Sequence, residues 1–407
     1  YSGFAADNIS QLENITLTSE VGTIGDIVVG VGTSVIISSA STVTVGTVES
    51  VSIGTHFSPP VGGIEERGQD FIEGMMRFNT DLNTMEFYNG NEWKQFTYQA
   101  DISNSPSSRG RGVFAGGNTP SKVSEIDFVN ISSLGNANNF GELTTAINQV
   151  AGSASEVRGL YGGGWDGSTR QDRNEYITIA SEGNAIDFGN LTQGRSHAGA
   201  CNSSTRSLVG AGYGPNRRNE IDYVEIATIG NSVDFGDTTL ARDELCALSS
   251  PTRGIFAAGA TPTQQNLIEF VTISSKGNAV KFGELTIRSS YACGGGNGIR
   301  GIIIPGNTPS PSGTDPTFID QITIASEGNV VDFGGQCVVA GGNRGGSGCT
   351  KTRMVYGVGT SPSSDYSNIL EFITINSNGN AQDFGDLTVT RSSPGGLSDS
   401  NGGLGGY

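Results

Sequence analysis

A Gly-Asn pair recurs six times in this chain at a nearly constant spacing. In every copy a Phe-Gly pair begins four residues after the Asn. The copies lie at Gly135-Asn136, Gly183-Asn184, Gly230-Asn231, Gly277-Asn278, Gly328-Asn329 and Gly379-Asn380. Successive copies are 48, 47, 47, 51 and 51 residues apart. A fixed period of about 40–50 residues indicates a repeat architecture in which each copy is one supersecondary unit.

The composition favours short strands and tight turns. Of the 407 residues 62 are Gly, and only 15% are charged. Gly, Ser, Thr and Asn suit turns, and β-branched residues suit strands. No segment has a sustained apolar period of 3.6 residues with helix caps, so almost no helix is expected. The predicted fold class is therefore all-β.

Each repeat contains four strand-like pieces. One begins with Arg and continues with apolar residues, as in 111–117, and the next is β-branched, as in 371–375. The third carries the Phe, and the fourth, such as 242–249, leads into the next Arg. Four strands in a repeat of this length are typical of one propeller blade. Residues 100–407 are predicted to form a β-propeller of six repeats of about 47–51 residues.

Stacked blades bury their faces against one another, so the six repeated Phe side chains are predicted to pack between blades. Residues 391–400 repeat the fourth piece after the last Phe and are expected to supply the innermost strand of the blade that starts at Arg111. A seven-blade alternative rests on Leu404, which is spaced like an extra second strand. In that alternative the hairpin at 75–97 would donate two outer strands.

Two segments precede the repeats. Residues 1–60 have short Val, Ile and Thr runs between Gly and Ser turns, too short to bury a core alone. We expect an oligomeric β shaft, a trimer, with a disordered or crystal-ordered tail as the alternative. Residues 61–99 form a second module, whose part 75–97 is predicted as two or three antiparallel strands around Asn89-Gly90. Residue 1 is Tyr, so a fragment or processed product is expected.

A resemblance to known proteins rests on the second module and on the repeats. Arg77-Phe78-Asn79, then Glu86-Phe87-Tyr88-Asn89-Gly90 and Trp93, resemble a small module in tail fibres of tailed bacteriophages. The repeat block looks like that of fibre-type proteins of marine cyanophages. Its strand order also resembles kelch repeats, with Phe where kelch usually has Trp. The resemblance implies a virion appendage, extracellular, that meets a host surface.

The loops between the second and third strands of each repeat vary, whereas the Ser-x-Gly-Asn turns hardly do. These loops are 118–124, 165–174, 213–219, 261–266, 307–317 and 360–368. They are expected to open on the same face as the connections from one repeat to the next. Variable loops on one rim are free to bind a partner, although they also drift where nothing restrains them. Aromatic and Arg side chains there suggest a glycan surface. The candidates are Trp165, Arg170, Tyr213, Arg217, Arg218 and Tyr366, together with Tyr161. The alternative for Trp165 is packing that anchors its loop.

Two sets of arginines recur. Arg195, Arg242 and Arg391 lie seven residues after a repeated Phe and Arg288 six, which would place four cations around a channel mouth. An anion site is one interpretation, and pairing with Asp237, Glu284 and Asp386 is the other. A second set opens the Arg-apolar pieces and is expected to pair with the Asp before each Phe: Arg111, Arg158, Arg206, Arg253, Arg300 and Arg353, with Asp187, Asp234, Asp332 and Asp383.

Several classes of function are disfavoured. A net charge of −17 and a pI near 4.5 argue against binding nucleic acid, and no apolar run reaches membrane-spanning length. Only His56 and His197 are present, so neither a metal site nor a Ser-His-Asp triad is expected, and no cofactor. The five cysteines are expected to be packing groups, with a Cys337–Cys349 disulfide left open. Carboxylate pairs for glycoside cleavage cannot be judged from spacing alone.

The preferred hypothesis is a non-enzymatic, homo-oligomeric tail-fibre protein. Its partners would be other virion tail proteins and a host cell-surface glycan, with no nucleic acid and no membrane insertion. One alternative is a purely structural virion scaffold, such as a collar or decoration protein. A second alternative is a polysaccharide-degrading propeller enzyme.

Overall fold

The computed structural model divides the chain into two compact units, Tyr1–Thr97 and Tyr98–Tyr407. It describes residues 59–67, 72–81, 84–95, 110–309, 317–338, 345–357, 359–360 and 366–405. The shaft predicted over residues 1–60 lies outside these residues, apart from Pro59 and Pro60. Within the described residues the only helices are two single turns of 3-10 helix, and the rest of the regular structure is β. The prediction of an all-β chain is confirmed.

The described residues of unit 1 form one four-stranded sheet in the order β1-β2-β3-β4. Its elements are β1 (Val61–Gly62), η2 (Ile64–Glu66), β2 (Met76–Asn79), β3 (Thr84–Tyr88) and β4 (Trp93–Gln95). The strands β2, β3 and β4 pair antiparallel, as predicted, and β1 is parallel to β2. Asn89 and Gly90 form the turn, where Gly90 has a φ of 89° and the Asn89 side chain accepts two backbone N–H groups.

The buried side of this small sheet is ionic. Glu86 is fully buried and accepts hydrogen bonds from Arg67 and Asn79, while Arg77 lies 3.5 Å away. The Arg67 hydrogen bond holds the pKa of Glu86 below its usual value. The aromatic residues Phe78, Phe87 and Trp93 are only half-buried. The centre of this sheet's buried side is therefore occupied by a paired and hydrogen-bonded carboxylate, that of Glu86, where an apolar core would be usual.

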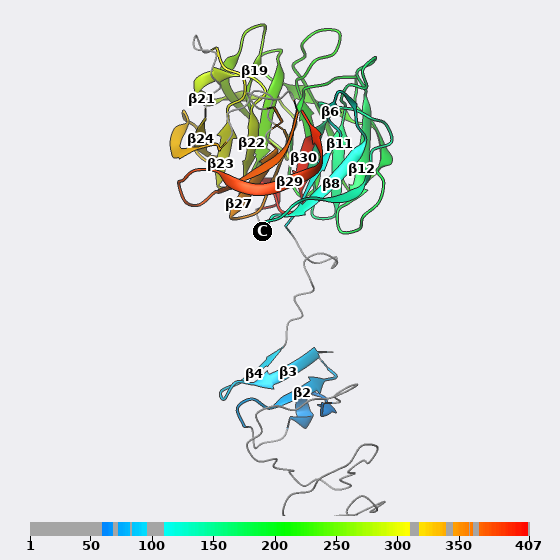
Figure 1. Ribbon diagram of the computed structural model, residues 1–407, viewed down its shortest axis with the longest axis vertical. Helices are drawn as coiled ribbons and strands as arrows, with labels where there is room; N and C mark the ends of the chain where they lie inside the picture. The colour runs from blue at the N-terminus through cyan, green and yellow to red at the C-terminus, as the bar shows by residue number, and fades with distance from the viewer. Residues whose placement is uncertain are drawn as a thin grey trace, which may run out of the picture. The chain divides into compact units, whose positions relative to one another are not determined.

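In the described part of unit 2 the strands form six four-stranded antiparallel sheets and a short hairpin (Figure 1). The first sheet combines β30 (Gly395–Ser398) with β5 (Arg111–Ala115), β8 (Glu125–Asn130) and β9 (Asn138–Glu142). The second contains β10 (Ala151–Ala154), β11 (Arg158–Gly162), β12 (Arg173–Thr178) and β13 (Ile186–Asn190). The third contains β14 (Gly199–Asn202), β15 (Arg206–Gly210), β16 (Glu220–Glu225) and β17 (Val233–Asp237).

The remaining three sheets follow the same order. The fourth contains β18 (Asp243–Ser249), β19 (Arg253–Ala260), β20 (Gln265–Thr272) and β21 (Val280–Ser289). The fifth contains β22 (Cys293–Gly296), β23 (Arg300–Ile304), β24 (Phe318–Thr323) and β25 (Val331–Gln336). The sixth contains β26 (Ser347–Cys349), β27 (Arg353–Gly357), β28 (Ser367–Thr374) and β29 (Gln382–Arg391). The hairpin is β6 (Asn118–Thr119) with β7 (Ser121–Lys122), and η3 (Gly402–Leu404) follows β30.

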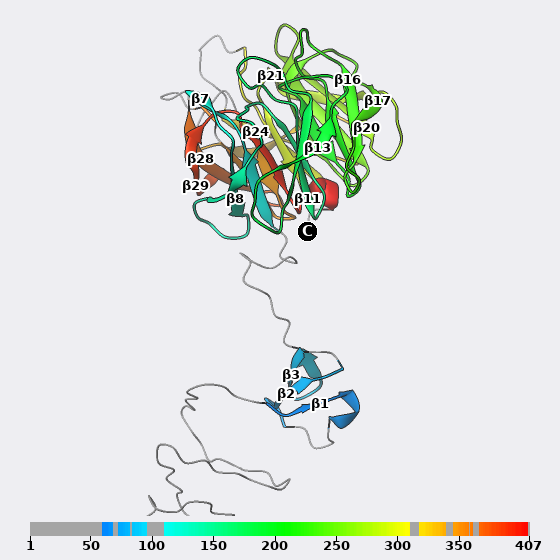
Figure 2. The ribbon, with the colours of Figure 1, turned by 90° about the vertical axis from the view of Figure 1, so that its right-hand side faces the viewer.

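The sheets close into a ring. Their first strands touch in the cyclic order β30, β10, β14, β18, β22, β26 and again β30. In two views at right angles β29 of the sixth sheet lies next to β8 of the first (Figures 1 and 2). The strand β30 pairs with β5, with Leu397 opposite Val113, so the chain's last strand completes its first sheet. This confirms the predicted role of residues 391–400. Leu404 lies in η3 instead of an extra strand, and β2 to β4 pair within unit 1, so neither premise of the seven-blade alternative is met.

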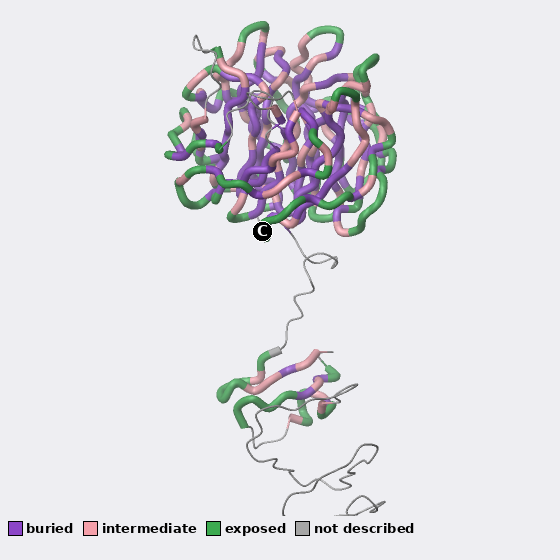
Figure 3. The backbone as a smooth tube through the Cα atoms, viewed as in Figure 1, coloured by how far each residue is buried: buried purple, intermediate pink, exposed green. Residues whose placement is uncertain are grey.

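The repeated Phe side chains pack between sheets, as predicted. All six are buried, and each lies in an apolar cluster with side chains of the next sheet. Phe384 of the sixth sheet, for example, packs with Val129, Ile131 and Ala137 of the first. Buried backbone concentrates in the strands, while exposed backbone lies mainly at the turns and loops (Figure 3). The apolar core is therefore distributed between neighbouring sheets around the whole ring.

Each Gly-Asn turn also holds two sheets together. The Asn side-chain oxygen accepts the backbone N–H of the preceding sheet's outer strand in all six copies, at 3.0–3.1 Å. The sixth copy closes the ring, because Asn136 of the first sheet accepts from Asp386 of the sixth. The turn also explains the Gly after five of the six Phe residues, because a Cβ there would meet the backbone of the next turn; after Phe333 it is Gly335, one residue later, that approaches the turn at Gly379. A Cβ on Gly236, which has a φ of 149°, would lie 2.5 Å from the carbonyl oxygen of Gly277.

The arginines that open each second strand make a third set of contacts between sheets. All six donate to main-chain oxygens of the next sheet, at 2.8–3.2 Å. Five also lie over an aromatic ring of their own sheet. The predicted pairing with Asp187, Asp234, Asp332 and Asp383 is wrong. Those carboxylates are exposed, whereas all six guanidinium groups donate to main-chain oxygens of the next sheet, and five of the six also lie over an aromatic ring.

Candidate functional site

One end of unit 2 carries all the variable loops, and we call it the loop face. In antiparallel sheets successive connections alternate between the two ends, so the loops after the second strand and the connections to the next sheet share one end. The other end, the turn face, carries the Gly-Asn turns. The loops are anchored by isolated backbone pairings, including Trp165 with Asn148 and Tyr213 with Ser196. The loop face is therefore a set of different loops on a uniform frame.

Trp165 and Tyr213 occupy equivalent positions in neighbouring loops, and each lies under a cation. Trp165 is half-buried, its N–H and C=O bond Asn148, and the Lys122 ammonium lies 4.6 Å from its ring centre. Tyr213 is also half-buried, with the Arg170 guanidinium 4.4 Å from its ring centre and that of Arg217 at 5.9 Å. Both aromatics therefore anchor loops and position cations.

The other predicted loop residues differ in availability. Arg217 is paired with Asp243 at 2.8 Å and Arg218 with Glu220 at 3.1 Å. The Tyr366 hydroxyl accepts from Asn118. Arg170 is exposed and, among the described residues, has no carboxylate partner. Tyr161 is fully buried in the core, and burial raises its pKa well above the usual value, so it does not belong to the surface.

The predicted ring of arginines at a channel mouth is wrong. Arg195, Arg242 and Arg391 are fully buried, and desolvation lowers the pKa of each. Each pairs with a buried carboxylate on a third strand: Asp222 at 2.9 Å, Glu269 at 2.7 Å and Asp127 at 2.8 Å. These partners replace the predicted Asp237, Glu284 and Asp386. Arg288 is exposed on β21, where the equivalent buried position is taken by Ser289.

The buried carboxylates are a conspicuous feature that sequence reasoning did not use. One occurs on the third strand of every sheet, four residues before its final Ile: Asp127, Glu175, Asp222, Glu269, Asp320 and Glu371. Where no buried Arg is available the carboxylate takes other partners. Thr286 donates to Asp320, Tyr356 donates to Glu371, and Arg173 pairs with Glu175. In five of the six sheets the carboxylate also accepts a backbone hydrogen bond from the segment that leads in from the preceding sheet.

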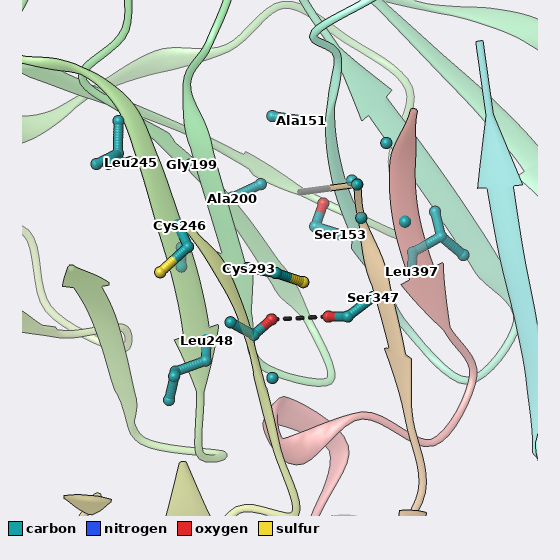
Figure 4. A pocket seen from close by; sticks show the side chains of 18 of the residues that line it. Ala151, Ser153, Gly199, Ala200, Leu245, Cys246, Leu248, Cys293, Ser347 and Leu397 are labelled. Atoms are coloured by element: carbon teal, nitrogen blue, oxygen red, sulfur yellow. Dashed lines mark hydrogen bonds between the residues drawn. The ribbon is translucent and has the colours of Figure 1, made fainter. Parts of the chain in front are cut away.

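A central channel of about 160 Å³ is lined by the first strands of all six sheets (Figure 4). The six wall residues that share one register around the channel are small: Gly152, Ala200, Ala247, Gly294, Ser347 and Gly396. The Ser347 hydroxyl donates to the Gly294 carbonyl at 2.7 Å, which joins two neighbouring strands across the wall (Figure 4). At the turn face Asn401 and Gly402 of the C-terminal segment also line the channel, and the Asn401 side chain contacts Asn202.

Five residues at the loop-face mouth of this channel adopt a left-handed backbone conformation. They are Gln149, His197, Glu244, Tyr291 and Ser393, nine residues after a repeated Phe, with φ between 52° and 61°. Their backbones form a belt, in which each N–H of the first four donates to the carbonyl of the preceding member at 2.8–3.2 Å. Sequence reasoning missed them. The available signal in the sequence was that five different polar residues occupy this one position, although the strands around it are similar.

Three of these side chains pack together. The His197 and Tyr291 rings meet edge to face at 5.3 Å, and the Tyr291 hydroxyl bonds Glu244. Burial lowers the pKa of His197 to about 4, with Arg170 contributing, and burial raises the pKa of both Glu244 and Tyr291. His197 is therefore neutral near pH 7. Within the described residues no group of three or more His, Cys, Asp or Glu side chains is arranged to hold a metal ion.

The cysteines are packing groups. All five are buried thiols, and the Cys337–Cys349 disulfide is not formed. Burial raises the pKa of Cys201, Cys246 and Cys349 to about 12, which disfavours the reactive thiolate.

No protein-family model matches the chain, and no curated protein matches it. Among the described residues there is no helix with the length and apolar character needed to cross a membrane.

Proposed function

We propose that unit 2 is a six-bladed β-propeller and that its loop face binds a glycan on a host cell surface. Six four-stranded sheets whose first strands touch in a closed cycle support the propeller assignment. The kelch-like strand order of the repeats agrees with it. In this proposal the protein is a non-enzymatic part of a virion appendage.

The observation that carries the proposal is the separation of constant from variable positions. The repeated Asn, Phe and Arg residues all make contacts between sheets, and they do so in every copy or nearly so. Their recurrence is thus explained by the ring itself. The second-to-third-strand loops take no part in these recurring contacts and differ in length and chemistry. Surface loops on a rigid frame are where binding residues usually lie.

The appendage assignment is supported by the resemblance of residues 77–93 to a tail-fibre module. A trimer of the whole chain, with residues 1–60 as its shaft, would present three loop faces to one surface. Linked sites bind a polyvalent surface more tightly than one site does, so weak individual glycan contacts would suffice. Other virion tail proteins are the expected partners at the opposite end of such a fibre.

The test uses the fluorescently labelled full-length chain and whole cells of marine cyanobacteria. In the decisive variant the loop 163–172 is replaced by the short sequence of the fourth loop, 261–264. We expect the wild type to adsorb and the variant to lose most adsorption. Periodate treatment of the cells, which cleaves sugar diols, should also abolish adsorption, whereas protease treatment should not. A matched control replaces the residue before a Gly-Asn pair, Ile229→Ser, on the turn face.

Two results would redirect the proposal to its alternatives. Adsorption that survives replacement of every second-to-third-strand loop would contradict it and favour the structural scaffold. Release of new reducing ends from cell-surface polysaccharide by the purified chain would instead favour the polysaccharide-degrading enzyme.

A further inference from the structure

We propose that the glycan is anionic and that Lys122 and Arg170 bind its acidic groups, an inference that rests on the proposed function of the loop face. The site is an arc across the loops of the first three sheets, from Lys122 past Trp165 and Arg170 to Tyr213. We call it the cationic arc.

The charge distribution among the loops is uneven in a chain of net charge −17. The second-to-third-strand loops of the first three sheets span residues 116–124, 163–172 and 211–219 and contain all four of the loop cations: Lys122, Arg170, Arg217 and Arg218. The corresponding loops of the other three sheets, 261–264, 305–317 and 358–366, contain no Lys or Arg. A local cationic region on an acidic protein attracts anions at short range, because charge farther than about 10 Å is screened.

Two of these cations are not neutralised by a carboxylate. Arg217 and Arg218 form ion pairs, whereas Lys122 and Arg170 have no carboxylate partner among the described residues. The Lys122 ammonium donates to the Asn118 side chain at 2.7 Å, and its partial burial lowers its pKa. An ammonium has three donors, so one bond to Asn118 leaves capacity for a ligand oxygen.

The loop that carries Arg170 is built to hold it. Asp166 accepts hydrogen bonds from the backbone and side chains of Ser168 and Thr169 and from Gln171. These bonds hold the pKa of Asp166 below its usual value, and they occupy its oxygens inside the loop. Arg170 pairs by backbone with Trp165 and reaches Tyr213 of the next sheet. The guanidinium is therefore positioned without being neutralised.

The cations also determine whether a ligand can stack on the aromatic side chains. A face of Trp165 is covered by Lys122 and a face of Tyr213 by Arg170. A sugar ring cannot stack on a face that is already covered. A cation lying on an aromatic face is held and partly desolvated, while its outward donors remain available to an anion. This favours a carboxylated or sulfated sugar over a neutral one.

The test measures binding of the full-length chain to immobilised polygalacturonate, dextran sulfate, neutral dextran and double-stranded DNA, at about 0.15 M salt. Polygalacturonate tests carboxylate groups and dextran sulfate tests sulfate groups. The variants are Lys122→Gln, Arg170→Gln and the double variant. Lys276→Gln is the matched control, since Lys276 lies 4.9 Å over the Tyr223 ring on the turn face and carries the same charge.

We expect binding to at least one acidic polysaccharide, none to dextran, and a loss of about tenfold or more in the double variant. Lys276→Gln should stay within about twofold of the wild type. Equal binding of dextran, no binding of either acidic polysaccharide, or an undiminished double variant would overturn the anionic assignment. DNA bound as tightly as the polysaccharides would contradict the assignment of a glycan as the ligand of the cationic arc. None of these results decides the loop-replacement experiment on cells, so the two proposals fail separately.

Discussion

The guanidinium of Arg353 in the sixth sheet donates to the main-chain oxygen of Ile131 in the first sheet, at 3.2 Å. The same Arg also donates to Ser132 at 3.1 Å. Five other arginines make the equivalent bond to the sheet that follows them in sequence. Arg353 makes it across the seam where the chain's two ends meet, so the seam uses the same chemistry as every other junction.

Replacing Arg353 by Met tests this equivalence. The substitution removes two hydrogen bonds and the cation over Phe372, and the expected loss in free energy of unfolding is about 1–3 kcal/mol. Arg158→Met is the control, since Arg158 makes the same contacts between the second and third sheets. Urea unfolding should give similar losses for both. A loss in Arg158→Met with none in Arg353→Met would show that the ring is open in solution.

Gly236→Ala should be strongly destabilising, by about 2–4 kcal/mol. The residue has a φ of 149°, and an added Cβ would meet the Gly277 carbonyl oxygen at 2.5 Å. Gly230→Ala is the control, because its Cβ would lie in open space and its φ is not in the left-handed region. It should change the free energy of unfolding by less than about 0.5 kcal/mol. Equal effects of the two substitutions would contradict the role given to the Gly-Asn turn.

The buried pair Arg242 and Glu269 permits a double-mutant cycle. Arg242→Met leaves a fully buried carboxylate without its cation and should cost about 3–5 kcal/mol. Adding Glu269→Gln should recover most of that loss, because the neutral side chain can still accept from the Thr239 backbone. Chemical unfolding of Arg242→Met, Glu269→Gln and the double variant measures the coupling. No recovery in the double variant would show that the Met side chain fails to pack, and that the ion pair is not the cause.

Acid should weaken the fold through His197. Its pKa is about 4 in the folded protein and about 6.5 when unfolded, so between these values the unfolded chain binds more protons. Stability is therefore fully present above pH 6.5 and falls as the pH drops toward 4, by at most about 3 kcal/mol. His197→Gln should flatten this loss in urea titrations at several pH values. Glu244→Gln should steepen it, since the raised pKa of Glu244 acts in the opposite direction.

Much of the ring of sheets could be predicted from the sequence, because every four-stranded sheet needs the same residues at the same positions. Phe384 and the closing strand β30 were predicted correctly from spacing alone. The carboxylate partners of the buried arginines were not predicted correctly. Arg391, three residues after Thr388, pairs with Asp127, which lies 264 residues away in the sequence. Only the closed ring brings Arg391 and Asp127 together. The belt at the channel mouth was missed because a left-handed conformation in Glu244 or Tyr291 leaves no sign in the residue type.

The candidate site was also predicted only in part. Trp165, Arg170 and Tyr213 were chosen because they stand in variable loops, and they do lie close together. The separate roles of the aromatic and cationic side chains could not be predicted from the sequence. Which aromatic face is covered by which cation depends on the contact of Arg170 with a ring in the neighbouring sheet.

Hydrogen–deuterium exchange of the full-length chain with purified cell-surface polysaccharide tests the central claim most directly. If constant positions build the ring and loops bind, protection should appear in the peptides that cover 116–124, 163–172 and 211–219. The Gly-Asn turns should exchange equally with and without the polysaccharide. Protection at the turns or along the outer strands, with none in these loops, would contradict the claim.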